Sequence, residues 1–165
     1  MPKAVVIGPP GSGKTTVGKA LAVRLATSFR DTDDDVQAVA GKPVGEIFVD
    51  DGEERFRELE REAVRLALAE HEGILAVGGG AVLAPETREL LAGHTVIYLE
   101  VGLSDAVKRV GLGTARPLLV LNPRSRLRQL MEERRPIYER LATITAATDG
   151  RTPDDIAEEL AKVLP

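Results

Sequence analysis

The stretch AVVIGPPGSGKTT, residues Ala4 to Thr16, decides the fold. It opens with an apolar, β-branched run typical of a buried strand, and residues 8–15 then satisfy the pattern G-x-x-x-x-G-K-[ST]. Val17, Leu21 and Leu25 follow at a spacing of four residues, which indicates one face of an amphipathic helix. A strand, a glycine-rich loop and a helix are thus predicted in the order that a phosphate-binding loop requires.

Each residue type in this loop has a chemical reason. Glycines let backbone N–H groups turn toward an anion, and the following helix points its positive end at the same place. Lys14 can reach the outer phosphates of a nucleotide, and the Thr15 hydroxyl can bind Mg²⁺. A glycine-rich turn without any ligand is the alternative, but the flanking strand and helix argue against it. The residues predicted to contact the nucleotide here are Gly11, Ser12, Gly13, Lys14, Thr15 and Thr16.

The alternation of strands and helices continues along the chain. Residues 74–77 and 95–99 are apolar runs, and weaker strand patterns occur at residues 28–30 and 143–147. Such an alternation predicts a parallel sheet covered by helices. Residues 111–123 follow neither period, so we predict a mobile loop there. The further predicted helices are Glu53–Glu70, Pro85–Leu91, Ser104–Arg109, Ser125–Ala142 and Pro153–Val163, the last capped by Thr152.

Composition narrows the class of protein. A length of 165 residues suits one domain that spans residues 1–165. A formal net charge of −4 does not supply the broad attraction to phosphate backbones that nucleic-acid binders need, so no nucleic-acid partner is expected. The chain has no cysteine, and its longest apolar runs fall far short of a membrane span. We therefore expect a cytoplasmic protein without a membrane partner.

Two acidic or glycine-rich motifs follow predicted strands, and ligands of open α/β sheets collect beyond the carboxyl ends of the strands. In Asp31-Thr32-Asp33, one carboxylate can orient or deprotonate a hydroxyl group and another can hold Mg²⁺. Helix capping by Asp33 or Asp34 is the alternative. In Gly78-Gly79-Gly80, the bare backbone permits close approach of a ligand or, alternatively, forms a tight turn.

Two arginines are candidates for binding an anionic ligand. Glu60 lies one helical turn after Arg57 and could orient it, although Glu53 and Arg57 also form an ordinary exposed pair. Arg134 shares a helical stripe with apolar residues, whereas Arg135 falls on the polar face. Because an unpaired buried arginine is costly, Arg134 must meet a carboxylate from the protein or from a ligand.

Short motifs in a fixed order carry a family resemblance. They are Gly-x-x-Gly-x-Gly-Lys-Thr, Asp-Thr-Asp, Gly-Glu-x-x-Phe-Arg, Gly-Gly-Gly-Ala, Arg-Pro-Leu-Leu and Arg-x-Pro-x-Tyr. Together they resemble the shikimate kinases over nearly the whole chain, and only the first is common to many P-loop proteins. The resemblance implies a three-layer α/β/α P-loop kinase fold, with a central five-stranded parallel sheet and a lid loop over about residues 111–123.

The same resemblance implies a role for each matching residue. Lys14 and Thr15 would hold the phosphates and Mg²⁺, and Asp31 would be a further partner of the metal. Asp33 would bind the acceptor hydroxyl and act as the base, while Arg116 would reach the phosphates from the lid. The implied catalytic residues are Asp33, Lys14 and Arg116; those binding shikimate are Asp33, Arg57, Gly79, Gly80 and Arg134; those flanking the adenine are Arg109, Arg151 and Pro153.

The activity that the resemblance implies is transfer of the γ-phosphoryl group of ATP to the 3-hydroxyl of shikimate, in chorismate and aromatic amino-acid biosynthesis. The family also implies a monomer that uses Mg²⁺. A related kinase acting on gluconate or a nucleoside monophosphate is one alternative, and a non-catalytic ATP-binding switch is another. One departure concerns the metal, because relatives often carry a hydroxyl group where this chain has Ala76.

Overall fold

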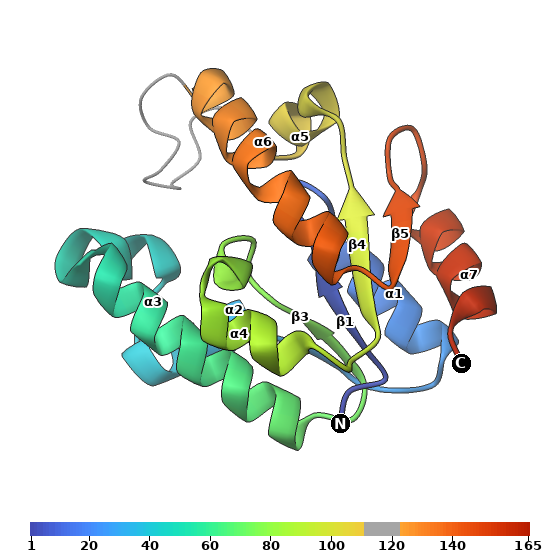
Figure 1. Cartoon of the computed structure of the whole chain (residues 1–165), viewed down its shortest axis with the longest axis horizontal. Coiled ribbons are helices and arrows are strands. Elements are labelled where there is room, and N and C mark those ends of the chain that lie inside the picture. The colour runs from blue at the N-terminus through green and yellow to red at the C-terminus, as the bar shows by residue number, and fades with distance from the viewer. Residues whose placement is uncertain (111–122) are drawn as a thin grey trace.

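The computed structural model describes residues 1–110 and 123–165 and has a parallel sheet with helices on both faces (Figure 1). The spatial order of its five strands is β2-β3-β1-β4-β5, and every neighbouring pair is parallel. The predicted three-layer α/β/α fold with a five-stranded parallel sheet is thereby confirmed. The strands are β1 Ala4–Ile7, β2 Phe29–Asp31, β3 Ile74–Ala76, β4 Val96–Glu100 and β5 Ile144–Ala147.

Strand β1 lies at the centre of the sheet and is buried on both faces, which explains its uninterrupted apolar run. Its side chains alternate between two core clusters. Val5 and Ile7 face the cluster covered by α3 (Val44–Glu70), α4 (Pro85–Leu91) and α6 (Pro123–Leu141). Ala4 and Val6 face the other cluster, on the side of the helices α1 (Lys14–Arg24) and α7 (Pro153–Val163).

Most predicted helices are present within a few residues of their expected bounds. Helix α4 and helix α7 begin and end where the sequence indicates, and α5 spans Leu103–Val110. The predicted cap of α7 is also confirmed, since the Asp155 backbone N–H donates to the Thr152 hydroxyl at 3.1 Å. Helix α6 continues through Pro136, so it extends over the residues that were expected to form one apolar stripe.

The segment between β2 and residue 53 differs from the prediction. Helix α2 (Thr32–Ala40) agrees with the alternative in which an aspartate caps a helix, although the cap is Asp31 rather than Asp33 or Asp34. The first part of α3 was not expected. Gly52 interrupts α3 with φ 89° and ψ 163°, a conformation that a residue with a side chain rarely adopts. Packing of Val36 and Ile47 against Phe56 holds these short helices, so tertiary contacts rather than periodicity decide this region.

The topology brings three sequence motifs to one edge of the sheet. Because β2, β3 and β1 are neighbours and parallel, the segments that follow them meet at their common carboxyl ends (Figure 1). Arg116 and the predicted lid lie outside the described residues, apart from Pro123, which begins α6. In the part of the chain that the structure describes, no helix combines the length and apolar character needed to cross a membrane.

Candidate active site

The phosphate-binding loop joins β1 to α1. Gly11 and Gly13 have φ angles of 82° and 89°, left-handed conformations that favour glycine and let the backbone curl around a small space. The Lys14 ammonium donates to the carbonyl oxygens of Gly8 at 2.9 Å and Pro9 at 3.2 Å, so it lies across the loop. Ser12 is buried and its hydroxyl has no hydrogen-bond partner within the described residues. The loop thus presents a cation and an unsatisfied polar group together.

Thr15 and Asp31 form a pair of oxygen ligands beside the loop. The Thr15 hydroxyl donates to Oδ2 of Asp31 at 3.0 Å, while Oδ1 of Asp31 accepts from the Asp33 backbone N–H at 2.9 Å. Mg²⁺ prefers hard oxygen ligands and usually takes only one or two from the protein, alongside water and phosphate. The pair therefore fits a Mg²⁺ ion bound with a nucleotide. Among residues 1–110 and 123–165, no group of three or more His, Cys, Asp or Glu gathers as a metal cage.

The second half of the site surrounds the glycine run after β3. A Cβ placed on Gly78 would lie 2.8 Å from Oε2 of Glu60 and 3.0 Å from Oδ1 of Asp33, so these carboxylates border the loop. A Cβ on Gly80 would lie 2.6 Å from Nη2 of Arg57. The glycines are required here because functional side chains of α2 and α3 come directly against the backbone.

Glu60 is the buried partner of Arg57. Its side chain is 4% exposed, and Oε1 accepts from Nη1 of Arg57 at 2.7 Å. Burial raises the pKa of the Glu60 carboxyl above its ordinary value. The charges of Arg57 and Arg134 lower this pKa, whereas the charge of Asp33 raises it further. These four side chains therefore form one electrostatic group, which we call the acceptor-side cluster. The alternative partner, Glu53, is 3.6 Å from Arg57 and exposed.

Arg134 comes to the site from α6, as its place on the apolar stripe predicts. It is 5% exposed, whereas Arg135 lies at the surface. A Cβ on Gly79 would lie 3.6 Å from Nη1 of Arg134 and 3.3 Å from Cδ of Pro10, so this glycine separates the arginine from the phosphate-binding loop. Only Gly79, which has no side chain, therefore lies between Arg134 of the acceptor-side cluster and the phosphate-binding loop.

Arg109 lies on the nucleotide side and is held by backbone oxygens. Its Nη1 donates to the Gly11 carbonyl at 3.2 Å and to the Thr148 hydroxyl at 3.0 Å, and its Nη2 donates to the Thr148 carbonyl at 3.1 Å. Arg151 donates to the Ala147 carbonyl and pairs with Glu159 at 2.7 Å. Thr16 and Pro153, the remaining predicted residues on this side, are exposed at the starts of α1 and α7.

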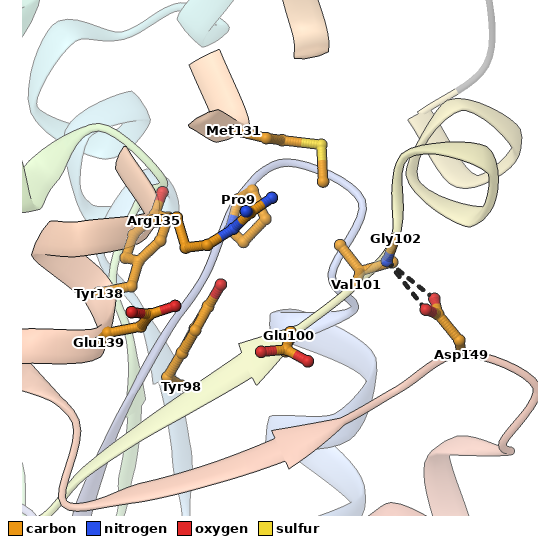
Figure 2. A pocket seen from close by; sticks show the side chains of 10 residues that line it. All are labelled: Pro9, Tyr98, Glu100, Val101, Gly102, Met131, Arg135, Tyr138, Glu139 and Asp149. Atoms are coloured by element: carbon orange, nitrogen blue, oxygen red, sulfur yellow. Dashed lines mark hydrogen bonds between the residues drawn. The ribbon is translucent and has the colours of Figure 1, made fainter. Parts of the chain in front are cut away.

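A pocket of about 370 Å³ lies between α6 and the ends of β4 and β5, next to the phosphate-binding loop (Figure 2). It contacts the loop only at Pro9, and none of the predicted site residues lines it. At the edge of the pocket, the Gly102 backbone N–H donates to both carboxylate oxygens of Asp149, each at 3.0 Å. The pocket therefore lies beside the candidate site and shares with it only Pro9 of the loop and Tyr138 of α6.

Three residues of the site carry more weight than their sequence patterns indicate. Glu60 was considered only as a possible orienting partner, and Thr148 and Tyr138 were not among the predicted site residues. A polar residue at the end of a predicted strand is a signal for Thr148, and the buried stripe is a signal for Tyr138. Neither signal identifies the acceptors of these hydroxyls, which are the carbonyl oxygen of Glu100 for Thr148 and that of Gly79 for Tyr138.

The comparisons with known proteins agree with one another. The family model described as shikimate kinase matches residues 10–165. A shikimate kinase of Salinispora arenicola is 61% identical over 163 residues, which cover 99% of this chain and 98% of the relative, and one of Thermobifida fusca is 60% identical over 99% of this chain and 95% of its own length. The solved shikimate kinase from Acinetobacter baumannii in complex with shikimate superposes with a TM-score of 0.93 at 33% identity, covering 97% of this chain and 90% of that one. The chain therefore belongs to the shikimate kinase family.

Proposed function

We propose that this chain transfers the γ-phosphoryl group of ATP to the 3-hydroxyl of shikimate, giving shikimate 3-phosphate and ADP. Family membership supports ATP as the phosphoryl donor and shikimate as the acceptor. The observation that carries the assignment to this site is the acceptor-side cluster, in which Arg57 and Arg134 lie beside Asp33 one glycine away from the phosphate-binding loop. Two guanidinium groups and one carboxylate suit a ligand that is both a carboxylic acid and a polyol.

On the acceptor side, Arg57 and Arg134 bind the shikimate carboxylate, and Gly79 and Gly80 provide the close backbone surface against which the ring lies. Asp33 accepts a hydrogen bond from the hydroxyl that reacts. The arginines fix the carboxylate of shikimate at one end of the site, and Asp33 acts as the base at the other end. The site therefore selects the hydroxyl whose distance from that carboxylate matches this spacing. A solved relative with shikimate bound, from Acinetobacter baumannii, supports this choice of ligand.

On the nucleotide side, Gly11, Ser12 and Gly13 offer backbone N–H groups to the phosphates, and Lys14 neutralises their charge. Thr15 and Asp31, which already share a hydrogen bond of 3.0 Å, are the residues that would hold Mg²⁺. Bound Mg²⁺ would neutralise charge on the phosphate oxygens. Arg109, Arg151 and Pro153 would border the adenine. Arg116, outside the described residues, is assigned to the phosphates from the family pattern alone.

The chemical step forms one bond and breaks one. The 3-hydroxyl oxygen of shikimate attacks the γ-phosphorus while the bond to the β–γ bridging oxygen breaks, and ADP leaves with the electron pair. Asp33 receives the hydroxyl proton. Because the transferred phosphoryl group has a loose transition state, most of the acceleration comes from alignment and from cations such as Lys14.

The assignment is tested by measuring ADP release from ATP with shikimate, gluconate or a nucleoside monophosphate as the acceptor. We expect turnover with shikimate only, and a product carrying one phosphate on the 3-oxygen. Turnover with gluconate or a monophosphate in place of shikimate would contradict the proposed acceptor. ATP hydrolysis that no acceptor stimulates would instead indicate a nucleotide-dependent switch.

We also propose that the enzyme is a cytoplasmic monomer whose partners are small molecules rather than nucleic acids or membranes. The net charge of −4 supports the absence of a nucleic-acid partner, because it does not supply a broad attraction to phosphate backbones. Light scattering on the purified protein would test the monomer. A mass of two or more chains would contradict it.

A further inference from the structure

Tyr138 is a buried residue whose hydroxyl reaches into the site. It lies on α6, is 1% exposed, and donates to the carbonyl oxygen of Gly79 at 2.6 Å. Its ring stacks on that of Tyr98, with the ring centroids 5.2 Å apart. The ring contacts hold the side chain in place, while the hydroxyl contacts a glycine of the acceptor side.

The same hydroxyl lies close enough to the Arg134 side chain for the guanidinium charge to act on it. Nη1 of Arg134 in turn lies 3.6 Å from the position that a Cβ on Gly79 would take. A phenol has a single proton, and Tyr138 donates it to the Gly79 carbonyl. Arg134, Tyr138 and Gly79 therefore form one contiguous group.

This group joins parts of the site that come from different elements. Gly79 lies between Arg134 and the phosphate-binding loop, where a Cβ would be 3.4 Å from the Gly8 carbonyl oxygen. Gly80, the next residue, lies against the Arg57 guanidinium. A change in the position of the Gly79 carbonyl would therefore move Arg134 and the backbone surface next to Arg57 together.

Burial keeps the hydroxyl in its donating form. Burial raises the pKa of Tyr138 to about 12, and the nearby charge of Arg134 opposes that rise. Through the neutral and mildly alkaline range, Tyr138 thus stays protonated and continues to donate to Gly79. An ionised tyrosine would lose this bond, because a phenolate cannot donate.

We propose that Tyr138 is a positioning residue for the acceptor, whose hydroxyl holds Arg134 and the Gly79–Gly80 backbone in the arrangement that binds the shikimate carboxylate. The inference rests on the proposed function, since it assigns Arg134 to that carboxylate. It differs from a role in folding alone because it predicts an effect on one substrate and not on the other.

The test is Tyr138→Phe, which keeps the ring and its stacking on Tyr98 and removes only the hydroxyl. We expect the KM for shikimate to rise about tenfold, the loss of roughly one buried hydrogen bond, while the KM for ATP changes less than about twofold. Tyr98→Phe is the matched control, because Tyr98 stacks on the same ring and lines the neighbouring pocket (Figure 2), and we expect no change in either KM.

A double-mutant cycle with Arg134→Ala shows whether the hydroxyl acts through Arg134. If it does, adding Tyr138→Phe to Arg134→Ala changes the KM for shikimate little. If the two residues act independently, the fold-changes in KM of the single variants multiply in the double variant. Equal rises in both KM values, a normal KM for shikimate, or a Tyr138→Phe protein that does not fold would each overturn the positioning role. A parent enzyme inactive on shikimate would overturn the proposed function itself, and this inference with it.

Discussion

The two halves of the site hold their cations by different means. On the nucleotide side, Lys14 and Arg109 donate to backbone carbonyl oxygens, including those of Gly8 and Gly11. On the acceptor side, Arg57 pairs with the buried carboxylate of Glu60, and Arg134 lies within the same electrostatic group. Arg109 also has a charged partner, Asp105, but the pair is 3.9 Å long and partly exposed, whereas Glu60 is buried against Arg57 at 2.7 Å.

This difference matches the charge of the two ligands. A neutral carbonyl orients a cation without cancelling its charge, so a cation held mainly by carbonyl oxygens keeps more of its charge for a polyanion than one paired with a buried carboxylate. Glu60 and Asp33 together balance the charges of Arg57 and Arg134, so the acceptor half has separated positive and negative regions but little net charge. Such a pocket suits a monoanion with a hydroxyl group, whereas a triphosphate requires the other half.

The largest expected effect comes from the residue of the acceptor half that is proposed to act on the reacting hydroxyl. Asp33→Asn removes the proposed base while leaving the shape of the side chain, so we expect turnover to fall by roughly 10²–10⁴-fold. ATP binding should be nearly unchanged, because Lys14 and the loop are intact. Steady-state turnover and calorimetric titration with ATP would check both parts. Turnover close to that of the parent would remove Asp33 from the chemical step.

A pair of arginine variants tests whether the halves are separate in function. Arg57→Ala should raise the KM for shikimate by roughly 10- to 100-fold with little change in the KM for ATP, since it removes a charged hydrogen-bond donor from the acceptor half. Arg109→Ala should do the reverse, with a rise of roughly tenfold for ATP. Steady-state kinetics with each substrate varied in turn would measure the four constants. Similar rises for both substrates in either variant would contradict the division.

The sequence predicts the strands and the functional loops that follow them well, because each loop is recognised from a few neighbouring residues. The phosphate-binding loop needs its glycines within a few residues, and parallel strands bring the Asp31–Asp33 segment and the glycine run to the same edge. Periodicity alone also places Arg134 on the buried face of α6. It does not predict the helix Thr32–Ala40, whose stability depends on packing against residues of α3.

The partners of the site residues are harder to predict, because they depend on tertiary placement. Glu53 and Glu60 both lie about one helical turn from Arg57, and only the orientation of α3 after the break at Gly52 decides that Glu60 is the buried one. The bond between Arg109 and Thr148 joins residues 39 positions apart. No sequence period relates such positions.

The buried charge of Glu60 also predicts a dependence of stability on pH. Because the folded protein raises the pKa of Glu60 above its ordinary value of 4.5, the folded state keeps a proton that the unfolded state has already lost. The contribution of Glu60 to the free energy of unfolding is therefore fully present below that ordinary value. It declines as the pH rises through the raised pKa.

Glu60→Gln isolates this contribution, because glutamine does not titrate. The difference in free energy of unfolding between the parent and Glu60→Gln should shift in favour of the variant as the pH rises from about 4 to about 8. Urea denaturation across this range would measure it. Glu53→Gln is the matched control, since Glu53 also contacts Arg57 but is exposed, and it shows what the loss of a charge beside Arg57 does without burial. A flat difference for Glu60→Gln would show that the Arg57 charge fully offsets the burial.

The smallest expected effect concerns the support of Arg109. The Thr148 hydroxyl donates to the Glu100 carbonyl at 2.8 Å and accepts from Arg109 at 3.0 Å, so it holds the guanidinium beside the loop. Thr148→Val keeps the shape and removes the acceptor, and we expect the KM for ATP to rise about two- to fivefold with the KM for shikimate unchanged.

Thr148→Ser keeps the hydroxyl and should restore the parent value, while Thr145→Val, an exposed change on β5 just before Thr148, should have no effect. Recovery by serine distinguishes a hydrogen bond from a packing effect, because serine lacks the methyl group that valine retains. If valine preserved the KM for ATP and serine raised it, the methyl group of Thr148 would be the important part. The nucleotide half would then depend on packing at the end of β5 rather than on an oriented arginine.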